Sequence, residues 1–294
     1  MPTAKTNQDD LKGELLALMA GSGKGKSTFA MQAPQPHAIL CVDKPIIAPL
    51  PRNFPDYDQA LSFGKFYPPP EKDLTDDKAL PSRIVFDEFI RDVQALKVAL
   101  YQGEPTFKMG DEEWKLPSTI IVEGMDFVRD HAINWVLNTH SKYHMDEFLT
   151  ADGRPNVFLG WGLVAAKMDE VFQNLAFLPS VRSVNVIVTI GLDEETKRQT
   201  INGKTELTKT GTFDPAFGGK LSLEAPRKFK DCWLAERLNG KSYMVVEPVT
   251  KYANYRGLRS GRFWPEGMVT GGLVDVTLDP KQPVNQWKRL LGGV

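Results

Sequence analysis

The chain has 294 residues, of which 41% are hydrophobic and 25% charged, the proportions of a soluble globular protein. Its 36 lysine and arginine residues against 37 aspartate and glutamate residues leave a net charge of −1, which excludes a uniformly basic nucleic-acid coat protein. The 2 cysteines are too few for a disulfide framework, and no apolar run approaches the roughly 18 residues of a membrane span. The first residues lack the apolar core of a secretion signal, so we expect a cytoplasmic protein with no membrane partner.

The charge is unevenly distributed along the chain. Residues 195–262 hold 14 lysines and arginines against 7 acids, a net of +7, and the remainder carries −8. A basic segment on an otherwise acidic chain points to an anionic partner bound on one surface. A solvated charged face explains the same distribution equally well.

The first expected strand is the apolar run LLALM at residues 15–19, and the glycine-rich segment AGSGKGKST follows at 20–28. This segment fits the phosphate-loop pattern [AG]-x4-G-K-[ST], and a helix-compatible stretch comes next. Glycines let backbone N–H groups turn towards phosphate oxygens. Lys26 would reach the β- and γ-phosphates, and the Ser27 hydroxyl would bind Mg²⁺. We expect ATP to be bound by Gly21, Ser22, Gly23, Lys24, Gly25, Lys26, Ser27 and Thr28.

A second buried strand is expected at residues 38–43. Eight prolines then stand in residues 45–83, which are interpreted as an extended, largely irregular insertion, because proline removes a backbone donor and fixes φ. Apolar residues recur at helical spacing over 86–101, with Asp87 as the expected N-terminal cap.

A short hairpin is predicted at residues 106–116, before an apolar strand that ends in Glu123. An acid at the end of such a strand can bind Mg²⁺ through water or polarise the water that attacks the γ-phosphate. A single glutamate fits both roles, and an acid that faces solvent is the alternative. Asp43 is a further acid expected near the metal or the water.

The remaining chain adds helices and strands in alternation before a change of pattern. Helices are expected at residues 125–137 and 162–178 and a buried strand at 184–191; a hairpin around Asn202-Gly203 and strands at 233–237 and 243–248 follow. Strands that alternate with helices predict an α/β fold with a mostly parallel sheet flanked by helices, here with C-terminal β-hairpins.

The order of the phosphate-loop strand, the strand ending in Glu123 and the strand at 184–191 resembles that of RecA-like P-loop ATPases. More narrowly, the chain resembles the phage-encoded single-domain RecA-like ATPases, which are core-only recombinases or single-strand annealing ATPases. Residues 161–189, 214–237 and 251–263 carry this similarity, which covers roughly 13–48 and 84–263. The resemblance implies a disordered tail at 1–12, a RecA-like ATPase domain at 13–264 that contains the proline-rich insertion, and a C-terminal extension at 265–294.

The resemblance also implies roles for individual residues. Lys26, Glu123 and Thr189 would be catalytic, with Thr189 as a sensor near the γ-phosphate. The subunits would assemble into a ring or filament, in which a cation completes the neighbour's site by stabilising charge on the transferred phosphoryl group. The candidates for this cation are Lys220 first, then Arg256 or Arg259; a surface cation without such a role is the alternative.

Single-stranded DNA is the expected anionic partner, because it binds where cations meet aromatic stacking platforms. The hairpin at 197–209 and the tail at 251–264 combine both kinds of side chain, although an ordinary strand edge with core aromatics fits too. The candidate DNA contacts are Lys197, Arg198, Lys204, Lys209, Arg256, Arg259 and Arg262, and the interleaved aromatics are Tyr252, Tyr255, Phe263 and Trp264. A single-strand DNA-binding protein is a further candidate partner.

Two departures from the family concern hydrolysis more than nucleotide binding. Residues 42–45 read VDKP where the family often carries Asp-x-Glu, and Glu123 stands where an aspartate is usual. A nucleotide-dependent adaptor or loader with weak or no turnover therefore remains open. A small-molecule kinase would need an arginine-rich lid helix, which is not evident before residue 180.

Metal and thiol chemistry are not favoured. His140 and His144 stand four residues apart near other candidate ligands, but no HExxH or cysteine partner accompanies them, so a polar loop is the better interpretation. Cys41 and Cys232 fall in expected buried strands, where a thiol behaves as a small hydrophobe.

Overall fold

The computed structural model of the chain describes residues 13–42, 58–68, 70, 79–201, 204–247, 249–261, 264, 266–277 and 287, without side chains at 79–83, 198–201 and 204–206. These residues fall in two compact units. The first lies within Met1–Leu15, Ala33–Ile46 and Asp58–Ile187, and the second within Leu16–Gln32, Ile47–Tyr57 and Val188–Val294.

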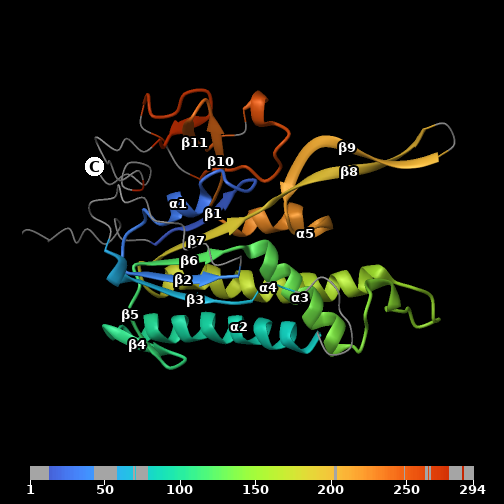
Figure 1. Cartoon of the computed structure of the whole chain (residues 1–294), viewed down its shortest axis with the longest axis horizontal. Coiled ribbons are helices and arrows are strands. Elements are labelled where there is room, and N and C mark those ends of the chain that lie inside the picture. The colour runs from blue at the N-terminus through green and yellow to red at the C-terminus, as the bar shows by residue number, and fades with distance from the viewer. Residues whose placement is uncertain are drawn as a thin grey trace, which may run out of the picture. The chain divides into compact units, whose positions relative to one another are not determined.

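Eight strands form the main sheet, in the order β12-β11-β10-β1-β7-β6-β2-β3 (Figure 1). Their bounds are β1 Leu15–Met19, β2 His37–Cys41, β3 Ser62–Phe66, β6 Thr119–Glu123, β7 Asn185–Ile190, β10 Asp231–Leu238, β11 Lys241–Val245 and β12 Leu273–Asp275. β10 is parallel to β1, and β2 is parallel to both β3 and β6, whereas β11 is antiparallel to β10 and β12. The predicted α/β class with a mostly parallel sheet is confirmed.

Three long helices dominate the first unit: α2 Ala79–Gln102, α3 Met125–Thr139 and α4 Val157–Val181. They pack against one another beside β2, β3 and β6 (Figure 1). Each helix presents apolar side chains at helical spacing to this core, and the largest buried ones include Phe86, Phe89, Leu96 and Phe172. The small hairpin of β4 Thr106–Met109 and β5 Glu112–Lys115 confirms the prediction for residues 106–116.

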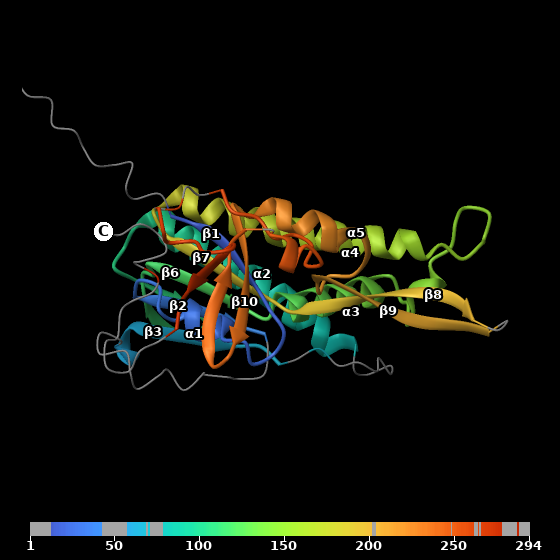
Figure 2. The same cartoon turned by 90° about the horizontal axis from the view of Figure 1, so that it is seen from above.

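The second unit pairs β1 with β10 and continues through β11 and β12. β10 and β11 are joined by Asn239-Gly240, whose φ angles of 49° and 79° are those of a type I′ hairpin turn. β8 Leu192–Ile201 and β9 Lys204–Pro215 form a long antiparallel arm (Figure 2). Its predicted turn residues, Asn202-Gly203, lie outside the described residues. The short helices α1 Lys26–Ala30 and α5 Gly219–Glu224 complete the unit, and no described helix has the length and apolarity to cross a membrane.

The prediction of a largely irregular insertion at 45–83 is wrong for its described part. β3 pairs with β2 over five residues, from His37↔Ser62 to Cys41↔Phe66, and so extends the parallel sheet. Its sequence, SFGKF, lacks the continuous apolar run of a buried strand because its residues are half-buried or exposed at the sheet edge.

The start predicted for the first long helix is also wrong. α2 begins at Ala79, with Pro81 in the first turn, where a missing backbone N–H breaks no intrahelical bond. Asp87 therefore lies within the helix and is not its cap; its carboxylate accepts a hydrogen bond of 2.8 Å from the Trp135 indole. Expected and observed helices otherwise agree, although α4 starts earlier, at Val157.

A half-buried ionic cluster joins β3 to α2. The Lys65 ammonium lies 2.7 Å from a carboxylate oxygen of Glu88 and 2.7 Å from one of Asp92. The same Asp92 oxygen accepts a hydrogen bond of 2.6 Å from the Tyr67 hydroxyl. Burial, with the Asp92 hydrogen bond and charge, raises the pKa of Tyr67, so the phenol stays a donor at all working pH values.

Asp92→Asn is expected to lower the free energy of unfolding by about 2 kcal/mol, because it removes the buried charge that Lys65 and Tyr67 share. Glu88→Gln is the matched control, since the Glu88 side chain is 33% exposed and its loss is expected to cost less than about 1 kcal/mol. Urea unfolding measures both values. Equal losses in the two variants would mean that Asp92 does not hold the cluster together.

Candidate functional site

The glycine-rich loop leaves β1 in a conformation that only glycine adopts without strain. Gly23 and Gly25 have φ angles of 72° and 93°, in the left-handed region. A Cβ atom placed on Gly21, Gly23 or Gly25 would meet no atom within 4 Å, so the loop faces open space at all three glycines. Such a turn, with exposed backbone at its tip, can direct N–H groups at an anion.

Lys26 and Ser27 open the helix that follows this loop. The Lys26 ammonium donates hydrogen bonds to the carbonyl oxygens of Ala20, at 2.9 Å, and Gly21, at 3.4 Å, so its charge lies over the loop. The predicted helix is confirmed but has only five residues, Lys26–Ala30, and we assign its dipole no large part in binding. Phe29 of this helix packs against two tryptophans, with its ring centroid 6.3 Å from that of Trp233 and 5.6 Å from that of Trp287.

The loop stands at a point where connections in the sheet run in opposite directions. After β1 the chain crosses to β2, which lies on the same side of β1 as β7. After β7 the chain crosses back to β10, which lies on the other side of β1. The carboxyl ends of β1 and β7 meet, because the Ala20 N–H donates to the Ile190 carbonyl at 3.2 Å. Open α/β sheets bind ligands at such switch points. Thr189, at the end of β7, is 1% exposed.

Glu123 ends β6 in the first unit and therefore belongs to a different unit from the loop. Its carbonyl accepts a hydrogen bond of 2.9 Å from the Val42 N–H, which places it beside the carboxyl end of β2. Gly124, with a φ angle of 85°, follows as the N-cap of α3. Glu123 is thus the last residue of β6, and α3 follows directly after Gly124, as the sequence predicts. Asp43 lies outside the described residues.

A second lysine of the loop forms an ion pair. The Lys24 ammonium is 2.7 Å from a carboxylate oxygen of Glu236, on β10, and the two side chains are 40% and 14% exposed. The two residues are 212 positions apart, so sequence patterns could not have paired them.

The three candidates for a cation that acts in a neighbouring subunit differ in their surroundings. Lys220, on α5, is 83% exposed and lies 3.0 Å from Glu224 of the same helix. Arg259 is exposed, and its backbone pairs with that of Cys232. Arg256 instead forms ion pairs within the second unit, 3.2 Å from Glu195 and 3.3 Å from Asp214. Lys220 and Arg259 are the more accessible of the three.

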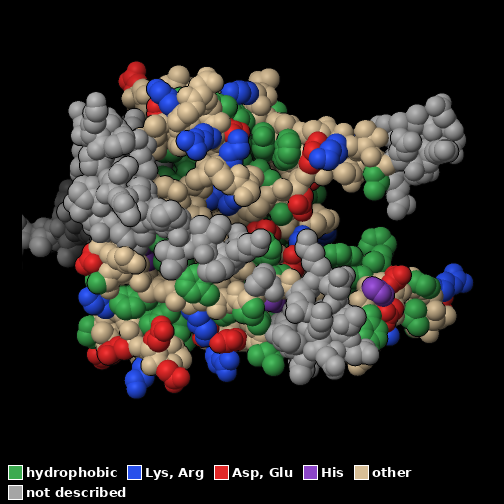
Figure 3. Space-filling model, viewed as in Figure 1, with side chains coloured by type: hydrophobic (Ala, Val, Ile, Leu, Met, Phe, Trp, Pro, Cys, Tyr) green, Lys and Arg blue, Asp and Glu red, His purple; other side chains and the backbone are tan. Residues whose placement is uncertain are grey.

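The predicted DNA contacts are spread over the arm and the tail. Lys197 and Lys209 are exposed on the arm, 3.7 Å from Glu195 and 2.9 Å from Glu194 respectively, so charges of both signs stand together there (Figure 3). Arg198 and Lys204 lie in β8 and β9, but their side chains, like all of Arg262 and Phe263, fall outside the description.

The described aromatics of the tail pack inside the second unit. Tyr252 is 2% exposed, Tyr255 stacks on Phe213 at 4.9 Å, and Trp264 lies 5.5 Å from Trp233. Exposed aromatics occur instead in the first unit, at Tyr143 in the expected polar loop between α3 and α4 and at Phe158 and Trp161 near the start of α4. Figure 3 shows hydrophobic side chains on the surface of this unit. Tyr143, Phe158 and Trp161 are 47%, 82% and 40% exposed there.

The histidines do not gather into a metal site. The ring of His140 lies edge-on to Phe148 at 5.5 Å, and the His144 N–H donates to Glu147 at 3.1 Å. Within the described ranges, no three His, Cys, Asp or Glu side chains are arranged to hold a metal ion. Cys41 and Cys232 are both buried, as predicted, and burial raises the pKa of Cys232 to about 12.

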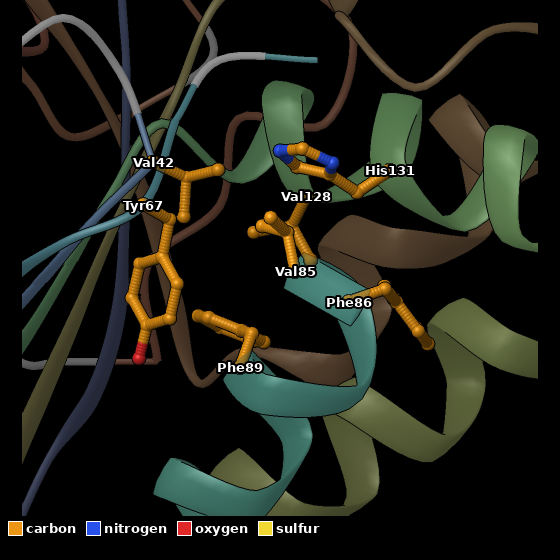
Figure 4. Close-up of a pocket in the computed structure, with 7 residues that line it drawn as sticks. All are labelled: Val42, Tyr67, Val85, Phe86, Phe89, Val128 and His131. Atoms are coloured by element: carbon orange, nitrogen blue, oxygen red, sulfur yellow. The ribbon is translucent and has the colours of Figure 1, made fainter. Parts of the chain in front are cut away.

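His131 borders a small hollow in the first unit that is too narrow for a water molecule, formed where α2 and α3 meet the ends of β2 and β3 (Figure 4). Its Nε2 donates a hydrogen bond of 2.9 Å to the Pro68 carbonyl, and Nδ1 is buried with no partner among the described groups. The other lining residues are apolar except at the Tyr67 hydroxyl, so the hollow has little to offer a polar ligand. Burial lowers the pKa of His131 to about 4.

No family model matches the chain, and no curated protein matches it.

Proposed function

We propose that the chain is a RecA-like P-loop ATPase that binds and hydrolyses Mg-ATP and acts on single-stranded DNA in phage recombination, annealing or replication, in the cytoplasm of the host cell. One observation carries the nucleotide part: a loop with two left-handed glycines leaves β1 at the switch point of a mostly parallel sheet and continues directly into Lys26 and Ser27.

The residues present suit a magnesium nucleotide. Open space at the three loop glycines accommodates phosphate oxygens, and the Lys26 ammonium already lies over the loop. The Ser27 hydroxyl is an oxygen donor of the kind that Mg²⁺ takes together with phosphates and water. When bound, the ion neutralises charge on the phosphates. Glu123 and Ser27 are the residues that would hold it.

Hydrolysis would proceed by in-line attack of water on the γ-phosphorus, with cleavage of the bond to the β–γ bridging oxygen and release of ADP and phosphate. Lys26 would stabilise the charge that develops on the γ-phosphoryl group. Glu123 would orient the water, and Thr189 would sense the γ-phosphate. Lys220 or Arg259 of a neighbouring subunit in a ring or filament would supply a further cation.

The arm supports single-stranded DNA as the partner. It carries exposed Lys197 and Lys209, and Arg198 and Lys204 belong to the same two strands. Exposed aromatics such as Tyr143, Phe158 and Trp161 are of the kind that stack on bases.

A nucleotide-dependent adaptor or loader is the second candidate. The same exposed cluster favours it, because Leu149, Val157 and Leu159 accompany the aromatics and are 50%, 37% and 46% exposed. Apolar side chains gathered in this way also mark protein-binding surfaces.

ATP turnover with and without single-stranded DNA tests the proposal. We expect DNA to stimulate turnover and to bind with an affinity that falls steeply with salt, because four lysine and arginine contacts to phosphate give a slope of about −3 in log K against log salt. In the double variant Lys197→Gln, Lys209→Gln two of these contacts are lost, and the slope is expected to become shallower by about 1.4.

Lys241→Gln is the matched control, because Lys241 is an exposed cation on β11 that the proposal does not use. Turnover indifferent to DNA, with a salt slope equal in the double variant and the wild type, would favour the adaptor.

A further inference from the structure

We propose that the Lys24–Glu236 ion pair couples the nucleotide loop to the base of the β8–β9 arm, so that a nucleotide on the loop changes how the arm is held and how it binds its ligand. The inference rests on the proposed function, since it takes a polyphosphate at the loop as its trigger.

The first link is the ion pair itself. Lys24 stands between the two left-handed glycines, so any adjustment of the loop around a phosphate moves its ammonium. Glu236 is mostly buried, and the same oxygen that faces Lys24 accepts a hydrogen bond of 2.8 Å from the Arg237 N–H. A lysine is a flexible point charge, and a bound polyphosphate competes with Glu236 for it. Lys24 can therefore pair either with Glu236 or with a bound phosphate, but not with both at once.

The second link is Tyr255. Burial is the main reason why the pKa of Tyr255 is raised; the Glu236 carboxylate raises this pKa further and the Lys24 ammonium lowers it. The Tyr255 ring stacks on Phe213 of β9, with an interplanar angle of 14°. The backbone is tied at the same place, because Phe213 donates to the Asn254 carbonyl at 2.7 Å and accepts from the Arg256 N–H at 2.8 Å.

The third link is Arg256, which follows Tyr255 in the chain. Its guanidinium pairs with Glu195 of β8 and with Asp214 of β9, so one cation holds both strands at the base of the arm. The register shift between Glu194 and Thr196 lies at this point. The other carboxylate oxygen of Asp214, Oδ1, is buried with no partner in the described part of the chain. Arg256 therefore provides the compensating charge for this partly buried carboxylate.

The Lys24–Glu236 pair lies at the loop, and the Tyr255–Phe213 stack and the Arg256 ion pairs lie at the arm. The charges of Glu236 and Lys24 act on Tyr255 and so relate the two sets of contacts. When Lys24 turns to a phosphate, Glu236 loses its cation and the charge that acts on Tyr255 changes. The segment 254–256, which holds the base of the arm, is then expected to shift. Coupling of this kind is reciprocal: a ligand on the arm must change nucleotide affinity by the factor by which the nucleotide changes affinity for that ligand.

Glu236→Gln tests the coupling in the full-length chain. In the wild type, a single-stranded oligonucleotide is expected to change the affinity for a non-hydrolysable ATP analogue by at least about fivefold, and the analogue to change oligonucleotide affinity equally. In Glu236→Gln both factors are expected to approach one. Glu247→Gln, a change at an exposed carboxylate of the same unit, is the control and should keep the wild-type factor.

Hydrogen exchange of the arm gives a readout that needs no DNA. The analogue is expected to alter exchange in residues 192–201 and 204–215 of the wild type and to leave it unaltered in Glu236→Gln and in Tyr255→Phe, which keeps the ring stack but lacks the hydroxyl. Unchanged coupling in both variants would overturn the inference and leave the proposed function intact. A wild type that binds no nucleotide would overturn both.

Discussion

Replacement of Lys26 by alanine is expected to weaken Mg-ATP binding by roughly 10- to 100-fold and to lower turnover by at least about 100-fold. The first figure corresponds to the loss of about 1.5–3 kcal/mol from hydrogen bonds between a charged donor and the phosphates. The second reflects loss of a donor aimed at charge that develops in the transition state. Isothermal titration calorimetry and phosphate release measure the two quantities.

The fold should survive this change, because the Lys26 side chain contacts two carbonyl oxygens at the half-exposed loop. A melting temperature close to that of the wild type would show this. Lys241→Ala, at an exposed lysine of the same unit, should leave binding and turnover unchanged. If Lys26→Ala bound and hydrolysed ATP like the wild type, the loop would not be the nucleotide site.

The second large effect is a loss of stability in acid caused by His131. Its pKa in the folded chain is about 4, against 6.5 when exposed, because burial disfavours the charged ring. Between these values the unfolded chain binds more protons than the folded chain, so stability falls as the pH drops from 6.5 to 4. The difference of pKa corresponds to about 3 kcal/mol, fully retained above pH 6.5 and lost near pH 4.

His131→Gln isolates this contribution. A glutamine amide can replace Nε2 as the donor to the Pro68 carbonyl but does not titrate. The free energy of unfolding, measured by urea from pH 7 to pH 4, is expected to fall by about 3 kcal/mol more in the wild type than in the variant. Parallel pH profiles would show that His131 titrates in the folded chain as it does when exposed.

Features set by a few neighbouring residues could be predicted from the sequence. β1 has the predicted bounds, because LLALM is a continuous apolar run that ends in glycines. The turn of the glycine-rich loop follows from the same local property, since its positive φ angles fall on glycine. Glu123 ends its strand as expected for the same reason.

Features that depend on distant contacts could not be predicted. β3 is half-polar and follows a proline-rich stretch, and only its pairing with β2 makes it a strand. Tyr252 and Tyr255 read as exposed aromatics beside cations, yet tertiary packing buries the first and stacks the second on Phe213. The partners of Arg256 stand 42 and 61 residues away, a pairing that charge counts cannot reveal.

The support beneath the glycine-rich loop comes from the far end of the chain. β1 pairs with β10, and Phe29 of α1 packs on Trp233 and on Trp287. During synthesis, the loop therefore emerges from the ribosome long before the residues that hold it. At 5–20 residues per second, the wait is roughly 10 to 50 s. A nascent chain that stops before Trp287 has the complete loop sequence without its full support, so the proposed ability to bind nucleotide should be among the last properties that the protein acquires.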